Sequence, residues 1–488
     1  MNTYINSYIC TYKDIIKNKN SLSASTYQKI NINYKKLKKI KDYFSRDLDN
    51  SDKGFEPGSI SYIGNSKYKF VRSKALQNNL FICDIKKNTF KPIHQKHFKK
   101  NNFKINDVLI TKDSNVGASG ILKNSTKNLC FSGAFLRVPL KKEDKFYVYS
   151  FLKSKFYFEQ LKFLIPKGST LSHGKDIIFE AQIPDLHVSD QRRVDLEFLI
   201  RLRTLYEQRV KFKSKIIKEI IKHEIENNQK QKKFIFNFPN YKDIYLSKRL
   251  DSSTYSYDYK KNNFEIMNYK FGYNDLNSYG YRGIRGSSLE INSIKVRLDS
   301  DVYKKNFYKL VIPTNISEYF TVTETNYIGT PVKLKTIRKG DIIFGGEGFS
   351  KGRSYVVCDD EENIATNYHG IRIVNNKSNL DDSIFVNCFL SFWRDKGMID
   401  AIGVGGSGGH CSPEYFHMIL IPNFKENIKK KIKEIYLSNS EIDLKKIKKK
   451  FKDYFFNLGI YELDLLMQKI DQLIKKKQDE ILFNKKIN

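Results

Sequence analysis

The chain of 488 residues carries 87 Lys plus Arg against 53 Asp plus Glu, and its 40% hydrophobic and 14% aromatic content exclude wholesale disorder. Its length predicts two to four domains, and we find neither an apolar run of eighteen residues nor a signal peptide. The six cysteines form no Cys-x-x-Cys pair, which argues against a zinc site or a disulfide framework and predicts a cytoplasmic location.

The first half of the chain predicts a mixed α/β domain. One or two helices are expected within the first forty residues, ending in YKKLKKIKDYF, and a further helix from Phe146 to about Leu164. Between Ser45 and about Pro184, short runs of Val, Ile, Phe and Tyr are broken by Gly, Asn, Asp and Ser. These runs predict strands at 59–64, 67–73, 79–85, 107–113 and 135–140.

A long helix is predicted from Gln191 to about Lys233, because this run lacks Gly and Pro and repeats apolar residues every three or four positions. Such a stripe needs a partner helix, and residues 461–482 carry a similar one. We expect the two helices to pair through Leu199, Leu202, Tyr206, Val210, Ile217 and Ile220 in the first, and Leu463, Met467, Ile470 and Ile474 in the second.

The second half predicts another mixed α/β domain. Residues 271–288 are rich in loop-forming residues, and a helix is expected over 382–402. It is followed by the glycine loop GVGGSGGH at 403–410. Strands are predicted at 340–346, 353–359, 369–374 and 416–422.

The two halves repeat each other. Tyr12-Lys13-Asp14-Ile15 recurs at 241–244, and Ser25-Thr26-Tyr27 at 253–255. The segments around Asp107 and Asp341, the loops at 168–173 and 405–410, and the Ile-Pro pairs at 183 and 421 also match. These five matches keep the same order, with offsets drifting from 229 to 238. They indicate a tandem repeat of one unit, a domain followed by a helix.

Catalytic motifs are missing from the chain. There is no Pro-Pro dipeptide, no phosphate-binding Gly-x-x-x-x-Gly-Lys-Ser/Thr and no His-Glu-x-x-His. The acidic run Asp359–Glu362 has the density of a nuclease metal site, but such a run is more often a solvated loop. His173 and His410 occupy equivalent places in the two halves, and a structural or DNA-contacting role is favoured over catalysis.

The net charge of +34 favours a polyanionic partner, with nucleic acid as the first candidate. Coding drift in an AT-rich genome is the alternative, although it leaves the shortage of acid unexplained. The glycine loop has two open interpretations, a phosphate cradle and a plain turn. DNA contacts are predicted from loop residues able to reach phosphates or base edges. They are Lys112, Asn115, Lys167, Ser169, Thr170, His173, Lys175, Tyr281, Arg282, Arg285, Lys351, Arg353, Asn367, Tyr368, His369, Ser407 and His410.

The chain resembles the specificity (S) subunit of type I restriction–modification systems, or a close relative serving a fused methyltransferase–nuclease. Asn106-Asp107-Val108-Leu109 and Lys339-Gly340-Asp341-Ile342-Ile343 are similar to the family's Lys-x-Gly-Asp-Ile. The Gly-Ser-Thr and Gly-Gly-Ser loops, Ile183-Pro184 with Gln191, and Arg249-Leu250-Asp251 with Tyr255 also match family patterns.

The resemblance implies an α+β fold with two target-recognition domains joined by two long antiparallel coiled-coil helices. The expected boundaries are 1–188 for the first domain with its N-terminal segment, 189–236 for the central helix, 237–424 for the second domain and 425–488 for the C-terminal helical region. It implies a non-catalytic protein that binds a bipartite site on double-stranded DNA. It also implies adenine-N6 methyltransferase (M) subunits, two of them, and restriction (R) subunits as partners. S-adenosylmethionine, ATP and Mg²⁺ would act in those partners, with no cofactor and no metal on this chain and no membrane.

Some features depart from the family pattern. The second Pro of Ile-Pro-x-Pro is missing in both halves, and no Gln follows Pro422 at the corresponding place. A surplus from roughly Ser438 to Ile460 affects how the two helices pair in register. Two rival functions stay open: a stand-alone nucleic-acid-binding or inhibitory module of the same plan, and a nuclease built from scattered acids.

Overall fold

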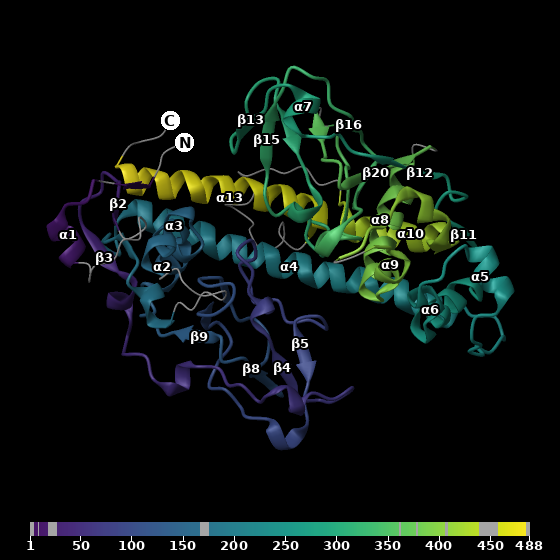
Figure 1. The fold of residues 1–488 in the computed structure, drawn as a ribbon, viewed down its shortest axis with the longest axis horizontal. Coiled ribbons are helices and arrows are strands. Elements are labelled where there is room, and N and C mark those ends of the chain that lie inside the picture. Colours follow the sequence, from purple (N-terminus) through teal and green to yellow (C-terminus); the bar gives the residue numbers. More distant parts are fainter. Residues whose placement is uncertain are drawn as a thin grey trace. The chain divides into compact units, whose positions relative to one another are not determined.

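A computed structural model of the chain describes residues 4–7, 9–17, 27–165, 175–360, 363–376, 379–405, 408–438 and 457–484 (Figure 1). They form the predicted α+β fold, grouped into two compact units. Unit 1 is Met1–Gln208 with Lys469–Asn488, and unit 2 is Arg209–Gln468. The long helices α4 (Gln191–Asn227) and α13 (Ile460–Phe483) each contribute residues to both units.

Unit 1 contains two small sheets, ordered β7-β6-β9 and β5-β4-β8, and two antiparallel strand pairs, β1-β2 and β10-β3. The sheet β5-β4-β8 lies at the end of this unit away from α2 and α3 (Figure 1). The elements are β1 (Ile5–Ser7), α1 (Tyr12–Lys17), β2 (Gln28–Ile30), β3 (Leu37–Lys39), β4 (Lys69–Val71), β5 (Phe90–Pro92), β6 (Val108–Thr111), β7 (Ser119–Ile121), β8 (Leu129–Phe131), β9 (Phe135–Val138), α2 (Lys145–Leu152), α3 (Lys155–Leu164) and β10 (Gln182–Pro184).

Unit 2 contains the sheets β12-β20-β17-β18 and β13-β15-β14-β19-β16, and the antiparallel pair β11-β21. Its elements are α5 (Tyr241–Ser247), α6 (Tyr257–Met267), β11 (Tyr273–Asp275), β12 (Tyr281–Arg285), α7 (Ile291–Ile294), β13 (Leu298–Ser300), β14 (Tyr308–Leu310), β15 (Asn326–Gly329), β16 (Thr336–Ile337), β17 (Ile342–Gly345), β18 (Ser354–Val356), β19 (Ile364–Ala365), β20 (Gly370–Asn375), α8 (Leu380–Asp395), α9 (Met398–Ile402), β21 (Leu420–Pro422) and α10 (Glu426–Tyr436).

The two units repeat one strand topology. The antiparallel set β7-β6-β9 matches β18-β17-β20, with Thr111 opposite Phe135 in unit 1 and Gly345 opposite Gly370 in unit 2. The set β5-β4-β8, with its parallel pair β4-β8, matches β15-β14-β19, with its parallel pair β14-β19. The pair β10-β3 matches β21-β11. The repeat read from five short motifs therefore extends through both sheets.

The Asn-Asp and Gly-Asp motifs form the same turn before β6 and β17. Asp107 Oδ2 accepts a hydrogen bond from the backbone N–H of Lys104 (2.7 Å), and Asp341 Oδ2 accepts one from that of Arg338 (2.8 Å). The residue before each aspartate is left-handed, Asn106 with φ 74° and Gly340 with φ 86°. Gly and Asn are the residues that adopt this conformation most readily, which explains their use here.

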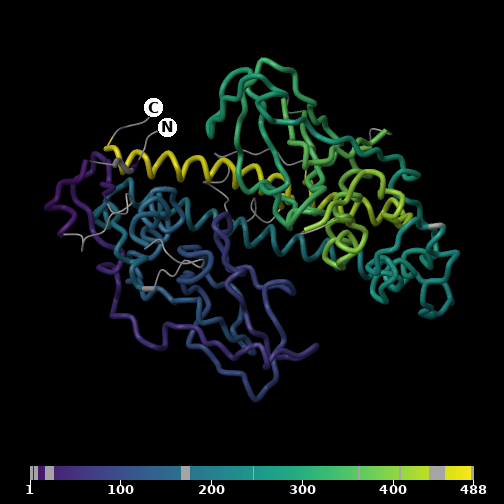
Figure 2. The backbone as a smooth tube through the Cα atoms, in the orientation of Figure 1, coloured from purple at the N-terminus to yellow at the C-terminus, as the bar shows by residue number. Residues whose placement is uncertain are grey.

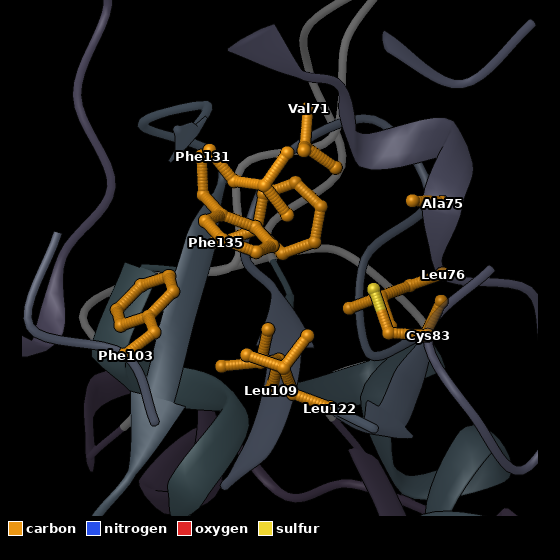
Figure 3. Packing of buried hydrophobic residues seen from close by; sticks show 11 residues of the cluster. Val71, Ala75, Leu76, Cys83, Phe103, Leu109, Leu122, Phe131 and Phe135 are labelled. Atoms are coloured by element: carbon orange, nitrogen blue, oxygen red, sulfur yellow. The ribbon is translucent and has the colours of Figure 1, made fainter. Parts of the chain in front are cut away.

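Aromatic and aliphatic side chains between the two sheets of unit 1 form a buried core cluster (Figure 3). Phe131 and Phe135 pack edge to face with ring centroids 5.5 Å apart, and Phe103 lies 5.2 Å from Phe131. Leu109 on β6 is fully buried within the same cluster. The burial of these rings ties β6, β8 and β9 together, because each buried aromatic removes a large apolar area from water.

In unit 1, the start of α4 and the end of α13 run antiparallel and lie side by side (Figure 2). Arg203 pairs with Asp471 at 2.8 Å, and Asp195 pairs with Lys477 at 3.2 Å. Of the ten residues predicted to pair the helices, eight are buried and two, Leu199 and Ile220, are half-buried. The buried ones are Leu202, Tyr206, Val210, Ile217, Leu463, Met467, Ile470 and Ile474.

Several predicted elements in unit 1 are wrong because distant partners override the local pattern. The run YKKLKKIKDYF contains no α-helix: Leu37–Lys39 form β3, which pairs with β10 more than 140 positions away, and Ile40–Tyr43 form a short 3-10 helix. Residues 79–85 form an isolated parallel bridge between Ile82 and Ile121 in place of a strand, and Glu207 on α4 accepts the backbone N–H groups of Phe81 and Ile82. Residues 59–61 form a short 3-10 helix after Gly58, whose φ is 78°.

Two predicted helices are divided, and one predicted loop contains two strands, β11 and β12. The helix expected from Phe146 breaks at Ser154, whose side chain caps α3 by accepting the N–H of Tyr157 (3.2 Å). The helix over 382–402 breaks at Gly397, which has φ 76°. The loop-rich segment 271–288 holds β12, which completes a sheet only by pairing with β20.

Candidate nucleic-acid interface

Unit 2 gathers charged and aromatic side chains at one edge of its four-stranded sheet. We call Arg285, Glu347, Tyr368, His369 and His410 the edge cluster. Arg285 ends β12, Glu347 follows β17, and Tyr368 and His369 precede β20. His410 closes the glycine loop and forms an isolated antiparallel bridge with Glu347. Four separate chain segments therefore meet at this edge.

Glu347 connects the charged members of the edge cluster. Arg285 Nη1 donates to Glu347 Oε1 at 3.0 Å, and His369 Nδ1 lies 2.6 Å from Glu347 Oε2. The Arg285 guanidinium also stacks over Tyr368, 4.8 Å from the ring centroid. Burial acts to raise the pKa of Glu347, but the hydrogen bonds to His369 and Arg285 outweigh it and hold that pKa below its usual value. Glu347 is therefore an anion at neutral pH.

The glycine loop is fastened to the loop after β17. Val404 and His410 exchange two backbone hydrogen bonds of 2.9 and 2.7 Å, and the N–H of Gly348 donates to Gly409 O at 3.2 Å. Lys351 Nζ donates to Gly408 O at 3.0 Å. The described residues of this loop are thus held by backbone contacts, and the loop positions His410 beside Glu347.

Two of the predicted DNA contacts are corrected by burial. The side chain of Tyr281 is only 3% exposed and lies beside Ser383, with its hydroxyl 3.4 Å from Ser383 Oγ. Lys351 is 6% exposed, because its ammonium donates to Gly408 O in the glycine loop and pairs with Asp400 at 3.3 Å. Neither side chain can reach DNA from this position. Both belong to the internal packing of unit 2.

Other predicted residues of unit 2 lie near the edge cluster or turn away from it. Arg353 is half-buried and donates to Ile316 O at 3.0 Å. Asn367 shapes the turn before β20 by accepting the N–H of Gly370 at 3.2 Å. Arg282 is exposed, but side chains alternate along a strand, so it lies on the opposite face of β12 from Arg285. Ser407 lies outside the described residues.

Sequence reasoning missed two exposed residues next to the edge cluster. Phe349 is 87% exposed on the short 3-10 helix Gly348–Ser350, directly after Glu347. Lys335 is exposed and its Nζ donates to Arg285 O at 3.2 Å. Phe349 could have been predicted as exposed from the sequence, because it is an aromatic residue within a glycine-rich loop. The residues around Lys335 do not predict its position at the edge cluster, because the position depends on its contact with β12.

Fewer predicted contacts of unit 1 fall on described residues. Lys112 is half-buried and Asn115 is exposed in the loop between β6 and β7, where Asn115 Nδ2 donates to Leu76 O at 3.4 Å. Lys175 opens a 3-10 helix, Lys175–Phe179. Lys167, Ser169, Thr170 and His173 lie outside the described residues. In unit 1 the described candidates are therefore Lys112 and Asn115 in the loop after β6, and Lys175 at the start of this 3-10 helix.

Among the described residues, no group of three or more His, Cys, Asp or Glu side chains could hold a metal ion. In the acidic run, Asp360 pairs with Lys339 at 2.9 Å, and Glu361 and Glu362 lie outside the described residues. Within the part of the chain that is described, no helix combines the length and apolar character needed to cross a membrane.

Comparison with known proteins finds similar solved structures, three of which come from type I restriction–modification systems. No family model matches the chain, and no curated protein is similar to it in sequence. The chain is similar to the type I restriction–modification S subunit from M. genitalium, with 13% identity over 94% of this chain and 99% of that one and a TM-score of 0.39. It is also similar to the HsdS subunit from Thermoanaerobacter tengcongensis, with 11% identity over 92% and 96% and a TM-score of 0.27. A chain from a structure on complex assembly and conformational transition of the type I R-M system matches with 10% identity over 93% and 99% and a TM-score of 0.29.

Proposed function

We propose that this chain is the DNA-sequence-specificity subunit of a type I-like restriction–modification complex, and that each unit recognises one half of a bipartite site. One observation carries the proposal: the same strand topology is built twice, with different side chains at the same edge. In unit 2 that edge holds Arg285, Tyr368 and His369. At the matching register of unit 1, Gly133 and Ala134 stand in place of Tyr368 and His369.

Two similar readers with different contact residues suit a target whose two halves differ in sequence. The distance between half-sites is set by whatever holds the readers apart, as in other two-part DNA-binding proteins. The net charge of +34 supplies affinity for the phosphate backbone that is independent of sequence and sensitive to salt. A few exposed loop side chains then supply the discrimination between bases.

In this proposal the chemistry belongs to partner subunits. Two adenine-N6 methyltransferase subunits would dock on this chain and use S-adenosylmethionine, and restriction subunits would use ATP and Mg²⁺ to cleave unmodified DNA. This chain would bind none of these cofactors. The complex would act in the cytoplasm, where reduced thiols such as the six free cysteines persist.

The decisive experiment is a genome-wide map of adenine methylation in the native host, with and without the gene. The deletion strain is complemented by the wild-type chain as the matched control. We expect deletion to remove methylation at one split motif and complementation to restore it. The lost motif would also identify the DNA target.

An unchanged map would overturn the proposal, provided that the strain expresses the chain and a neighbouring methyltransferase. Binding of the purified chain to random duplexes, with affinity that falls with salt but selects no motif, would then favour a stand-alone nucleic-acid-binding module. Metal-dependent cleavage of DNA by the purified chain alone would contradict a non-catalytic role.

A further inference from the structure

Resting on the proposed function, we infer that Arg285 recognises a guanine in the half-site read by unit 2, and that Glu347 and Tyr368 are positioning residues for its guanidinium. At the edge cluster, unit 2 carries Tyr368 and His369 where unit 1 carries Gly133 and Ala134. Such a difference is expected at positions that select bases, because the strand topology that the two units share does not require it.

The side chain of Arg285 is restrained from two directions. Its Nη1 donates to Glu347 Oε1 at 3.0 Å, which fixes one end of the guanidinium. The ring of Tyr368, 4.8 Å from the guanidinium carbon, restrains its plane. A free arginine loses about 2 kcal/mol of rotamer entropy when it is immobilised, and restraint before binding reduces that loss. Arg285 is therefore preorganised.

Glu347 is itself held in place, so it can act as a support. Its second carboxylate oxygen lies 2.6 Å from His369 Nδ1, and its backbone is bridged to His410. The N–H of Gly348 donates to Gly409 O at 3.2 Å, which ties the next residue to the glycine loop. The carboxylate that supports Arg285 is thus held by His369, on a backbone that is tied to the glycine loop.

The pair is placed for an external ligand. The side chains of Arg285 and Glu347 are 25% and 24% exposed, beside the exposed rings of Tyr368 and Phe349. Another ion pair of the same sheet, Arg372 with Asp341 at 2.6 Å, has a carboxylate only 5% exposed and stabilises a turn. Arg285 contributes to no such turn, and its outer face is open to a partner.

Guanine is the base that fits this arrangement. A guanidinium carries five N–H donors in a planar fork, and the bond to Glu347 uses one of them. In the major groove, guanine shows two neighbouring acceptors, O6 and N7, whereas adenine shows one acceptor and one donor. A restrained fork therefore favours guanine over adenine, since adenine leaves a donor facing a donor.

The test is selection of randomised bipartite duplexes by the full-length chain, followed by sequencing. We expect wild type to enrich a two-part motif with guanine at one position of one half. Arg285→Ala and Arg285→Lys are expected to reduce that guanine preference by about 5- to 150-fold and to leave the other half of the motif unchanged. Retention of the other half shows that the variant is folded and bound.

Further variants separate positioning from general structure. Glu347→Gln and Tyr368→Leu are expected to weaken the same guanine preference by about three- to tenfold, without affecting other positions. Arg297→Ala, which removes an exposed arginine directly before β13 in the other sheet of unit 2, is the matched control and should leave the preference intact.

Each outcome decides between the two proposals. If wild type selects a two-part motif and Arg285→Ala selects the same motif, the role of Arg285 is overturned and the specificity function stands. If wild type selects no motif, the specificity function itself fails, and the reading of guanine fails with it. A lost preference in Arg297→Ala that matches the loss in Arg285→Ala would also overturn the assignment.

Discussion

One buried contact occurs in both units with the same geometry but with different residues. In unit 1, Arg193 of α4 donates to Asp144 at 2.8 Å and lies over Tyr147, 4.7 Å from the ring centroid. In unit 2, Lys429 of α10 donates to Asp382 at 2.6 Å and lies 5.9 Å from the ring centroid of Phe385. A cation, a carboxylate and an aromatic ring meet in both units. Buried geometry is kept although the cation and the ring differ.

The exposed edges follow the opposite rule. The turns before β6 and β17 keep their aspartates, Asp107 and Asp341, and each aspartate faces an arginine of the neighbouring strand. Only a few residues later, Glu347 and Phe349 of unit 2 answer to Asp113 and Asn115 of unit 1. The units therefore share their scaffold and diverge where side chains leave it, which is the pattern expected of two readers for two sequences.

The two units contact different long helices. In unit 1, Glu207 of α4 accepts the N–H groups of Phe81 (2.8 Å) and Ile82 (3.1 Å) and pairs with Arg203 at 3.0 Å. In unit 2, Asp464 of α13 accepts the N–H of Val322 at 3.0 and 3.2 Å. Each unit presents one loop to a carboxylate on a long helix.

These contacts also locate the surplus residues of the second repeat. Lys429 lies 236 positions after Arg193, whereas Asp464 lies 257 positions after Glu207. The additional residues therefore fall between α10 and α13. This matches the surplus expected from roughly Ser438 to Ile460, of which 439–456 lie outside the described residues.

The largest effect is expected on breaking the helix contact of unit 1. Glu207→Ala removes the acceptor of two buried N–H groups and leaves Arg203 without one of its two carboxylates, at a cost of about 3–5 kcal/mol. Asp464→Ala should cost about 1–3 kcal/mol, since it withdraws an acceptor from one backbone group and from Gln468. Hydrogen exchange should accelerate at Phe81 and Ile82 in the first variant and at Val322 in the second. Faster exchange at all three amides in either variant would contradict separate anchoring of the two units.

A smaller effect is expected from breaking the buried contacts of Arg193 in unit 1 and of Lys429 in unit 2. Arg193→Met and Lys429→Met should each destabilise their own unit by about 1.5–3 kcal/mol, with Arg193 at the upper end because it also donates to Leu186 O and Glu143 O. Burial acts to lower the pKa of Lys429, but hydrogen bonds to Asp382 and Glu426 outweigh it and raise that pKa.

The raised pKa of Lys429 gives this contact a distinct pH dependence. A raised folded-state pKa stabilises the protein fully below the unfolded value of about 10.4, and the stabilisation is lost as the pH rises through the folded-state pKa. The difference in unfolding free energy between wild type and Lys429→Met should therefore be constant from pH 6 to 9 and shrink in stronger alkali. Denaturant titrations across this range measure it, and a decline already at neutral pH would exclude the proposed cause.

The left-handed turns provide a matched pair of milder changes. Gly340→Ala should destabilise unit 2 by about 1–2 kcal/mol, because φ is 86° there while the nearest atom to an added Cβ, Ser383 Oγ, is 3.9 Å away. Asn106→Gly should change the stability of unit 1 by no more than about 0.5 kcal/mol, since the exposed turn already has φ 74°. Thermal unfolding compares the two, and equal losses would indicate that contacts, not dihedral strain, dominate.

The smallest expected effect is chemical and leaves stability unchanged. Burial raises the pKa of Cys130 to about 11 and that of Cys411 to about 12, and Cys83, Cys358 and Cys388 are buried as well. A thiol reagent at pH 7.5 should therefore label Cys10 of unit 1 rapidly and no cysteine of unit 2. Mass spectrometry of the labelled peptides identifies the sites. Rapid labelling of Cys411 would reveal local opening of unit 2, and Cys10→Ser should abolish the fast phase.

The sequence alone was sufficient where structure is local or periodic. The two long helices are predicted over 191–233 and 461–482 and observed over 191–227 and 460–483. The strands β6, β9, β17 and β20 and the repeat itself also follow from spacing and short motifs. The DNA-contact candidates Arg285, Tyr368, His369 and His410 were chosen by residue type in loops, and the structure brings these four together. Their contact with DNA remains a prediction, as do the four domain boundaries.

Only the tertiary structure decided which candidates face solvent and which distant residues complete them. Tyr281 and Lys351 have the chemistry of DNA contacts but are buried by packing that no local pattern encodes. Residues 79–85 have the pattern of a strand, but Glu207, more than 120 positions away, accepts the N–H groups of Phe81 and Ile82, and the segment forms an isolated bridge to Ile121. Local pattern sets backbone preference through sterics and periodicity, whereas burial and hydrogen-bond partners depend on which segments meet, and that is a property of the folded chain as a whole.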